Sequence, residues 1–275
     1  MTFKTRSQSS ILRLAALIST NVAVVGSPSH CEVILSIELS THKVGPQEMS
    51  SAIPVQFNVS ASSGPRRVSA LLDRPSHSRW LLVFAHGAGA GMRHAFMNAA
   101  SAELVRRGVA TFRYQFPYME AGGGRPDPPS LLVATVRTAV DIAQDLARDL
   151  PLLAGGKSLG ARMTSTAASQ EKLTSVRGLV FFGFPLHPSG DPSVLRAKHL
   201  ESVHLPMLFL QGTRDKLAEP SLLAPVCEGL QARALVHWIQ DADHSFHVPK
   251  RSGRTDEDVL RELGETVEKW IGEIR

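Results

Sequence analysis

Residues 152–160 read LLAGGKSLG, a segment whose pattern is typical of a strand, a sharp turn and a helix in succession. The apolar run over 152–154 predicts a short buried strand, and a helix can begin at Ala161. Between them, residues 156–160 match Gly-x-Ser-x-Gly, in which the glycines permit a sharp, crowded turn with the serine at its apex. The amides at the start of the next helix can then face negative charge that develops beside the serine. We therefore predict that Ser158 is a nucleophile.

The same segment has a second interpretation, because Gly-Lys-Ser also ends the phosphate-binding pattern G-x-x-x-x-G-K-[ST]. The first glycine of that pattern would fall at Pro151, and the residues that follow it are needed as a strand. The next predicted strand, Leu179 to Phe182, ends without a carboxylate for Mg²⁺. These departures favour a nucleophile turn over a nucleotide-binding loop.

Two partners for Ser158 follow it in the order that this kind of turn requires, an acid and then a histidine. Asp215 closes the segment QGTRD (211–215) directly after an apolar strand, and His244 lies in DADHSF (241–246) directly after the last strand. We predict that His244 takes the proton of Ser158, and that Asp215 orients the imidazole and stabilises its charged form.

Alternatives to these partners remain open at this stage. Asp215 could simply form a side-chain turn, and His244 could be a packing or surface residue. His247 is the alternative base, and Asp243 or Asp241 is the alternative acid. Their positions relative to the predicted strands favour Asp215 and His244.

A glycine-rich loop, HGAGAGM (86–92), follows the unbroken apolar strand over 81–85. Small residues there allow a backbone N–H, that of Ala88 in preference to Gly87, to join the N–H of Leu159 as an oxyanion hole. Gly87 and Met92 are further predicted to contact substrate. The alternatives are a flexible glycine turn without a catalytic part, and a helix start at Met92.

From Val55 onward, short apolar runs alternate with helical patterns, which predicts one domain with a mostly parallel central sheet and helices on both faces. With the turn at Ser158, this is the α/β-hydrolase fold, and no segment is long enough for a large lid domain. The first two strands are predicted to form a hairpin at the sheet edge. Predicted strands cover 55–60, 67–73, 81–85, 109–114, 152–154, 179–182, 207–210 and 235–239, and predicted helices cover 94–107, 132–150, 161–169, 194–200, 222–231 and 259–271.

Residues 1–48 differ from the predicted domain at 49–275. Basic residues precede or interrupt an apolar stretch from Ile11 to Gly26, which resembles a signal peptide but contains polar Ser19, Thr20 and Asn21. We expect a poorly structured extension, with a translation start at Met49 or a weak signal as its explanation. A cytoplasmic location is favoured over export, and no membrane span is predicted.

Composition sets further limits. The chain has 275 residues, 43% of them hydrophobic, which is enough for one large globular domain. Its net charge of +5 comes from scattered Lys and Arg, so no nucleic-acid partner is predicted. The two cysteines form neither a disulfide framework nor a metal-binding pair, and we predict no metal and no cofactor. The oligomeric state stays open.

Six segments together carry a family resemblance: HGAGAGM (86–92), FPYME (116–120), GGKSLG (155–160), FPLHP (184–188), QGTRD (211–215) and ADHSF (242–246). From about Val55 to the C-terminus the chain resembles the α/β-hydrolases that include bacterial dienelactone-hydrolase-like proteins and the animal NSL-complex subunit three and testis-expressed thirty proteins. The resemblance implies the fold and the roles of Ser158, Asp215 and His244. Dienelactone hydrolases proper use a cysteine, whereas position 158 is serine, so their specific activity is not implied.

The residues thus predict a serine hydrolase that acts on a small-molecule ester, thioester or amide. The alternative is a catalytically silent interaction module, a use of this fold that the resemblance to chromatin-complex subunits also implies. Lys157, Arg162, Lys250 and Arg251 could favour acidic substrates, although solvated surface positions explain these four residues better.

Overall fold

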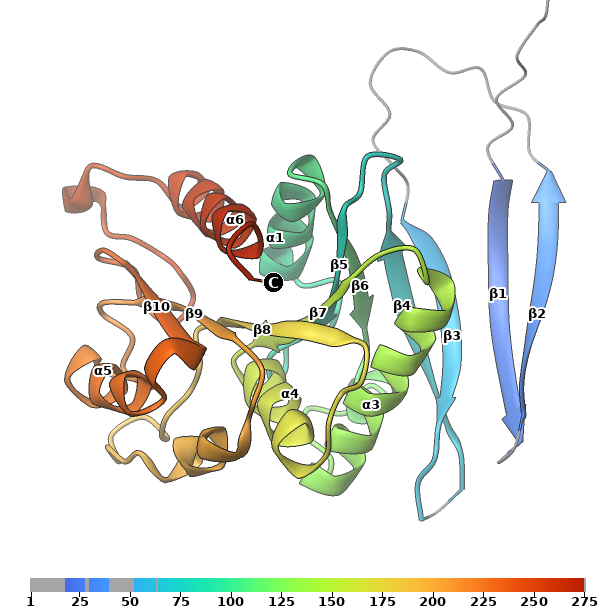
Figure 1. Cartoon of the computed structure of the whole chain (residues 1–275), viewed down its shortest axis with the longest axis horizontal. Helices are drawn as coiled ribbons and strands as arrows, with labels where there is room; N and C mark the ends of the chain where they lie inside the picture. The colour runs from blue at the N-terminus through green and yellow to red at the C-terminus, as the bar shows by residue number, and fades with distance from the viewer. Residues whose placement is uncertain (1–17, 28–29, 40–51, 63, 275) are drawn as a thin grey trace, which may run out of the picture.

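The computed structural model of the protein describes residues 18–27, 30–39, 52–62 and 64–274. Within them ten strands form one sheet in the order β10-β9-β8-β7-β5-β6-β4-β3-β1-β2 (Figure 1). The strands from β5 to β10 pair in parallel, whereas β4 pairs antiparallel to both β3 and β6. The strands are β1 Ile18–Ser27, β2 His30–Leu39, β3 Ile53–Val59, β4 Arg66–Asp73, β5 Trp80–Ala85, β6 Val109–Tyr114, β7 Leu152–Lys157, β8 Val176–Phe182, β9 Met207–Gly212 and β10 Ala234–Ile239.

Helices cover both faces of this sheet, as predicted. Helices α1 and α6 pack together on one face, and α3 and α4 lie on the other (Figure 1). The helices are α1 Ala95–Arg106, α2 Pro117–Glu120, α3 Pro129–Leu146, α4 Leu159–Gln170, α5 Pro220–Gly229 and α6 Asp256–Ile271, with short 3₁₀ turns η1 Leu195–Ser202, η2 Gln231–Arg233 and η3 Lys250–Ser252. None of the helices in the described ranges is both long and apolar enough to cross a membrane.

Strand β5 shows why the sheet needs cover on both sides. Leu81, Val83 and Ala85 join the hydrophobic core under α3 and α4, while Leu82 and Phe84 join the core under α1 and α6. All five side chains are at most 1% exposed. The unbroken apolar run of this strand therefore follows from burial on both faces.

Some predicted boundaries differ from the structure. Strand β7 runs on to Lys157, beyond the predicted end at Ala154, and helix α3 begins at Pro129, where a missing N–H costs nothing. Residues 195–202 form a 3₁₀ turn where a helix was predicted. Helix α5 begins at Pro220 and ends at Gly229, two residues before the predicted end.

The N-terminal segment changes the sheet edge. Strands β1 and β2 pair antiparallel, and Val22 and Ala23 of β1 pair in parallel with Val55 and Gln56 of β3. The β3–β4 hairpin is therefore internal, and the prediction that it lies at the edge is wrong. The two strands also differ from the poorly structured extension expected over residues 1–48, because their apolar, β-branched runs can pair as strands. Residues 1–17 and 40–48 of that segment lie outside the described residues.

Candidate active site

Ser158 occupies a strained turn between β7 and α4. Its φ of 50° and ψ of −111° lie in a region that residues other than glycine rarely adopt, and such strain persists only where the surroundings impose it. The flanking glycines explain how the turn fits. A Cβ at Gly156 would lie 2.6 Å from the carbonyl oxygen of Ala85, and one at Gly160 would lie 2.5 Å from the same oxygen. The Gly-x-Ser-x-Gly pattern is therefore a packing requirement of the turn against β5.

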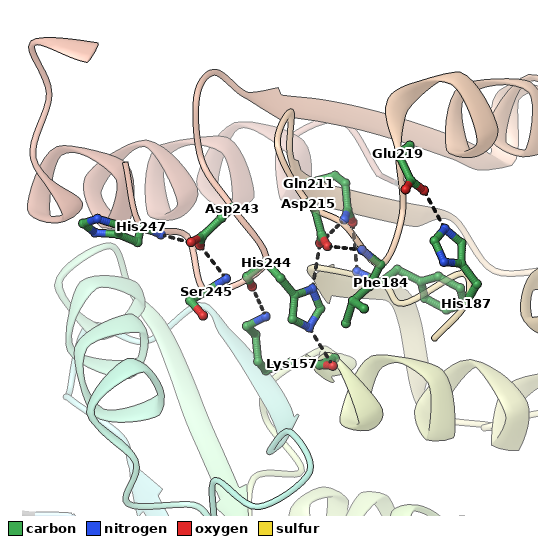
Figure 2. Close-up of polar contacts among 12 residues, drawn as sticks. Lys157, Phe184, His187, Gln211, Asp215, Glu219, Asp243, His244, Ser245 and His247 are labelled. Carbon is green, nitrogen blue, oxygen red and sulfur yellow. Dashed lines mark hydrogen bonds and ion pairs between the residues drawn. The ribbon is translucent and has the colours of Figure 1, made fainter. Parts of the chain in front are cut away.

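A continuous chain of hydrogen bonds joins the three residues that the sequence singled out, Asp215, His244 and Ser158. Figure 2 labels the first two of them. The Nε2 atom of His244 lies 2.9 Å from Oγ of Ser158, and Nδ1 of His244 lies 2.7 Å from Oδ2 of Asp215. The Asp215 side chain is fully buried, while that of His244 is 25% exposed. With Nδ1 donating to the carboxylate, Nε2 is left as the acceptor that faces the serine hydroxyl.

The Asp215 carboxylate is held from several directions. Its Oδ2 accepts a hydrogen bond of 2.5 Å from Nε2 of Gln211, and its Oδ1 accepts one of 2.8 Å from the backbone N–H of Leu217. Oε1 of the same Gln211 side chain accepts from the N–H of Phe184 at 2.9 Å. Because one Gln211 amide makes both hydrogen bonds, it links the loop after β8 to the acid after β9. The Gln211 side chain is fully buried.

A second connection braces the same two loops. The carbonyl oxygen of Leu217 accepts hydrogen bonds from the backbone N–H groups of Leu186 and His187. The His187 ring, which is fully buried, lies 2.6 Å from Oε2 of Glu219 through its Nε2 atom (Figure 2). The segment FPLHP thus supports the loop that carries Asp215 and does not reach Ser158 through any recorded hydrogen bond of its described residues.

The alternative acid and base make other contacts. Asp243 Oδ1 accepts hydrogen bonds from the backbone N–H groups of Ser245 and His247, which shapes the His244 loop (Figure 2). The exposed His247 ring binds Asp256, whose hydrogen bond raises the pKa of His247. The backbone N–H of Asp241 donates to Thr213. The structure therefore brings His244 and Asp215 to Ser158, and it does not bring His247, Asp243 or Asp241 there.

Lys157 does not lie on the solvated surface, which corrects the interpretation favoured from the sequence. It is only 9% exposed, and its ammonium donates a hydrogen bond of 2.5 Å to the backbone carbonyl of His244. Burial lowers the pKa of Lys157 to about 8, against the opposing effect of the Asp215 and Asp243 charges. The physical reason is the length of β7, which carries Lys157 under the His244 loop. Of the other three basic residues, Lys250 and Arg251 are exposed and Arg162 is half-buried.

The loop HGAGAGM packs directly against the serine turn. A Cβ at Gly87 would lie 3.6 Å from the carbonyl oxygen of Lys157 and 3.7 Å from Cβ of Ser158. His86 anchors the loop, because its Nδ1–H donates to the carbonyl of Gly87 and its Nε2 accepts from the N–H of Phe116. Burial lowers the pKa of His86 to about 4, so the ring is neutral in the folded protein near neutral pH. The exposed Ala88 follows next in the chain.

Met92 lies in a different part of the same loop from Gly87. It contributes to the wall of a hollow of about 450 Å³, together with Ser69, Gln115, Met119 and other residues. Its backbone N–H donates to Oε1 of Gln115 at 2.7 Å. Of the two predicted substrate contacts, Gly87 lies beside Ser158 and Met92 lines this neighbouring hollow.

Two supporting residues were not assigned a role from the sequence. Gln211 and His86 each follow a run of buried apolar strand residues and are themselves fully buried. A polar residue directly after a buried apolar run could have indicated a supporting role, because buried polar groups require hydrogen-bond partners. The identity of those partners depends on loops distant in sequence, which a local pattern does not specify.

Comparison with known proteins agrees with this architecture. Residues 78–272 match the alpha/beta hydrolase domain family, and the chain belongs to that family. The chain is thus an α/β hydrolase; its described residues form no large lid domain, and the candidate site lies at the carboxyl edge of the sheet.

Solved structures with the same fold include three proteins of low sequence identity. A dienelactone hydrolase from Anabaena variabilis is 19% identical, with a TM-score of 0.61 over 82% of this chain and 99% of that one. A lidless α/β serine hydrolase from Xanthomonas campestris is 18% identical, with a TM-score of 0.61 over 82% and 98%. Est1E from Butyrivibrio proteoclasticus is 17% identical, with a TM-score of 0.58 over 81% and 100%. At these identities the likeness establishes the fold.

Proposed function

We propose that this α/β-hydrolase is a serine hydrolase that cleaves a small ester, thioester or amide through an acyl-enzyme intermediate. The observation that carries the proposal is the unbroken hydrogen-bonded chain from Asp215 through His244 to Ser158, with distances of 2.7 and 2.9 Å. The strained backbone of Ser158 supports it further, because strain of this kind clusters at functional sites.

In the proposed reaction, Oγ of Ser158 attacks the acyl carbon while Nε2 of His244 accepts the hydroxyl proton. The carbonyl π electrons move to oxygen, which gives a tetrahedral oxyanion. When the bond to the leaving group breaks, the imidazolium returns the proton to that group and the acyl-enzyme remains. Water then repeats the sequence: His244 takes its proton, and Ser158 leaves as the alcohol. Asp215 keeps Nδ1 protonated and stabilises the imidazolium in both halves.

The N–H groups of Ala88 and Leu159 are the proposed oxyanion donors. Leu159 is the first residue of α4, so its N–H has no partner within the helix and lies at the positive end of the helix dipole. The participation of Ala88 is supported by its neighbour Gly87, where an added Cβ would lie 3.7 Å from Cβ of Ser158. Donors held in advance by the backbone stabilise an oxyanion strongly because they need no reorganisation.

For substrate binding, we propose that Gly87 closes one side of the acyl site and that Met92 contacts the substrate from the wall of the neighbouring hollow. No metal or cofactor takes part in the proposed reaction. We further propose that the hydrolase domain comprises residues 49–275, with β1 and β2 as an addition to the edge of its sheet, that it acts in the cytoplasm, and that scattered surface charge gives it no nucleic-acid partner.

The second candidate is a silent interaction module related to the NSL-complex and testis-expressed thirty proteins. Such a module has no need to keep an imidazole in line between a carboxylate and a serine. The distances at His244 therefore favour the hydrolase, and a relationship to the animal proteins stays a prediction.

Stopped-flow hydrolysis of 4-nitrophenyl esters of increasing acyl length tests the proposal. We expect a burst of nitrophenol equal to the enzyme concentration, followed by slower turnover, as for any accumulating acyl-enzyme. Ser158→Ala should abolish the burst, and the exposed Ser245→Ala, one residue after His244, should retain it. Absence of burst and turnover in a folded wild-type protein across the series would overturn the proposal.

A further inference from the structure

We propose that Lys157 is a positioning residue for His244: its ammonium fixes the backbone carbonyl of the histidine, so that the imidazole stays aligned between Asp215 and Ser158. This inference rests on the proposed hydrolase function. It assigns to the variable position of Gly-x-Ser-x-Gly a role that the pattern itself does not require.

The contact is specific because the ammonium lies between two loops. Nζ of Lys157 donates to the carbonyl oxygen of His244 at 2.5 Å (Figure 2). On its other side lies Gly183, where a Cβ would come within 2.9 Å of Nζ and 3.5 Å of the His244 ring. Gly183 has a φ of +67° and follows β8. A side chain at residue 183 would therefore displace the lysine head from its present position.

Two aromatic rings also lie close to the Lys157 ammonium. Phe96 of α1 and Phe246 of the His244 loop stack with centroids 5.4 Å apart and planes inclined by 13°. Nζ of Lys157 lies 5.7 Å from the first centroid and 5.1 Å from the second. An ammonium within about 6 Å of ring centroids is attracted by their π electrons. The rings therefore stabilise the charged head in a place where water is scarce.

The charged groups that act on this ammonium come from two loops. Asp215, after β9, and Asp243, beside His244, both favour the protonated form, whereas burial opposes it and is the larger effect. The element α1 contributes Phe96 and β8 is followed by Gly183, and neither residue is charged. The net result is a lysine whose pKa is lowered to about 8. Its charge is therefore present near neutral pH and is lost in a range that an assay can reach.

Holding a backbone carbonyl controls the imidazole because the two are parts of one residue. Nδ1 of His244 is tied to Asp215, and the carbonyl is tied to Lys157, so the ring and the peptide are both anchored. Release of one anchor lets the ring drift from Oγ of Ser158. A displacement of about 1 Å at a reacting group lowers the rate by about 10²-fold.

The test compares Lys157→Met, which keeps the apolar stem but not the donor, with Lys172→Met at an exposed site beyond the far end of α4. The rate at which a fluorophosphonate probe modifies Ser158, and kcat for an ester, should both fall about 10²-fold in Lys157→Met, while KM changes by less than about threefold. Lys172→Met should match the wild type in all three quantities. Circular dichroism verifies that each variant is folded.

A chemical rescue separates positioning from a loss of fold. In Lys157→Ala, added propylammonium, which matches the deleted atoms, should raise the probe-labelling rate at least about tenfold, whereas propan-1-ol, which has the same number of heavy atoms but no charge, should not. The wild-type labelling rate should also decline as the pH rises through about 8, the pKa of Lys157. This decline should be absent in Lys157→Met.

The outcomes distinguish the inference from the function on which it rests. A wild-type protein that neither labels nor turns over would overturn the proposed function. A wild type that labels at Ser158, together with a folded Lys157→Met that labels equally fast, would overturn the positioning role alone. If Lys157→Met does not fold, equal rescue of Lys157→Ala by propan-1-ol and propylammonium would overturn it.

Discussion

The two edges of the parallel part of the sheet differ in what they bring together. At the amino edge, before β7, β8 and β9, lies a hollow of about 690 Å³ whose lining includes Gln144, Asp149 and Lys172. At the carboxyl edge the neighbouring hollow is smaller, about 450 Å³. Yet the hydrogen-bonded chain that includes Ser158 lies at the carboxyl edge, where ligands of open α/β sheets bind. Hollow volume alone therefore does not locate the chemistry.

The carboxyl edge of the sheet differs from the amino edge because buried polar groups converge there. At the amino edge Asp149 pairs with Arg74 in an exposed ion pair, with 65% of the aspartate side chain accessible. At the carboxyl edge Asp215 is fully buried and accepts hydrogen bonds from Gln211, Leu217 and His244. Water screens the charge of the exposed Asp149 carboxylate. The buried Asp215 carboxylate is screened much less, and its hydrogen bonds hold it in one orientation. Matched substitutions at the two edges test this contrast.

The largest effect is expected from Asp215→Asn. An amide at this position favours the wrong imidazole tautomer, and kcat should fall about 10⁴-fold with the fold retained. The matched control is Asp149→Asn at the amino edge, where kcat should stay within about twofold of the wild type because exposed ion pairs contribute little. Steady-state ester hydrolysis measures both. A decrease in kcat of less than about tenfold in Asp215→Asn would contradict the proposed difference between the two edges.

The next effect is on stability and comes from His86. Its pKa of about 4 in the folded protein lies below the ordinary value of 6.5, so the unfolded chain binds more protons between these pH values. Stability should therefore fall as the pH falls from 6.5 towards 4, by on the order of 3 kcal/mol from this ring. Urea unfolding at several pH values measures the slope.

His86→Gln should flatten that slope, since glutamine does not titrate. The exposed His77→Gln is the control and should keep the wild-type slope. Equal slopes in wild type and His86→Gln would show that the His86 ring does not resist protonation in the folded protein.

Gln211→Leu should have a more moderate effect on catalysis. It removes the donor to Asp215 and leaves the N–H of Phe184 without its acceptor. A hydrogen bond to a charged group contributes about 1.5–3 kcal/mol, so kcat should fall about 10- to 100-fold. Gln144→Leu at the amino edge should have no such effect on kcat. A Gln211→Leu enzyme with wild-type kcat would show that the Asp215 loop keeps its position without the amide.

The smallest expected effect is an increase in stability in Lys157→Met. Because the pKa of Lys157 is lowered from 10.5 to about 8, the charged form is disfavoured by folding at neutral pH. Its removal, offset by the lost hydrogen bond to His244, should raise the free energy of unfolding by about 1–2 kcal/mol near pH 7. The wild type should correspondingly gain stability as the pH rises from 8 towards 10.5.

Urea titration measures this change, with Lys172→Met expected within about 0.5 kcal/mol of the wild type. A stabilised but slower Lys157→Met would be typical of a residue kept for function, whereas a strongly destabilised variant would indicate a structural role.

The sequence predicted the parts of this molecule that local patterns determine. The β5 apolar run, the turn around Ser158, and the chain order that ends in Asp215 and His244 all follow from periodicity and spacing. The contact of Lys157 with the His244 carbonyl and the bridge from Gln211 to Phe184 join residues 87 and 27 positions apart. Such pairings arise only when separate loops meet at one edge, so a local pattern did not anticipate them. The β1–β2 hairpin was missed because residues 1–48 were expected to form a poorly structured extension.

The most direct test of the central claim is the mass of the protein after reaction with a fluorophosphonate probe. The wild type should gain the mass of a single phosphonyl group, with the adduct mapped by peptide sequencing to Ser158, and Ser158→Ala should gain none. His244→Ala should react far more slowly, because the serine then lacks its base. A folded wild type without adduct, or an adduct that persists in Ser158→Ala, would contradict the assignment of Ser158 as the nucleophile.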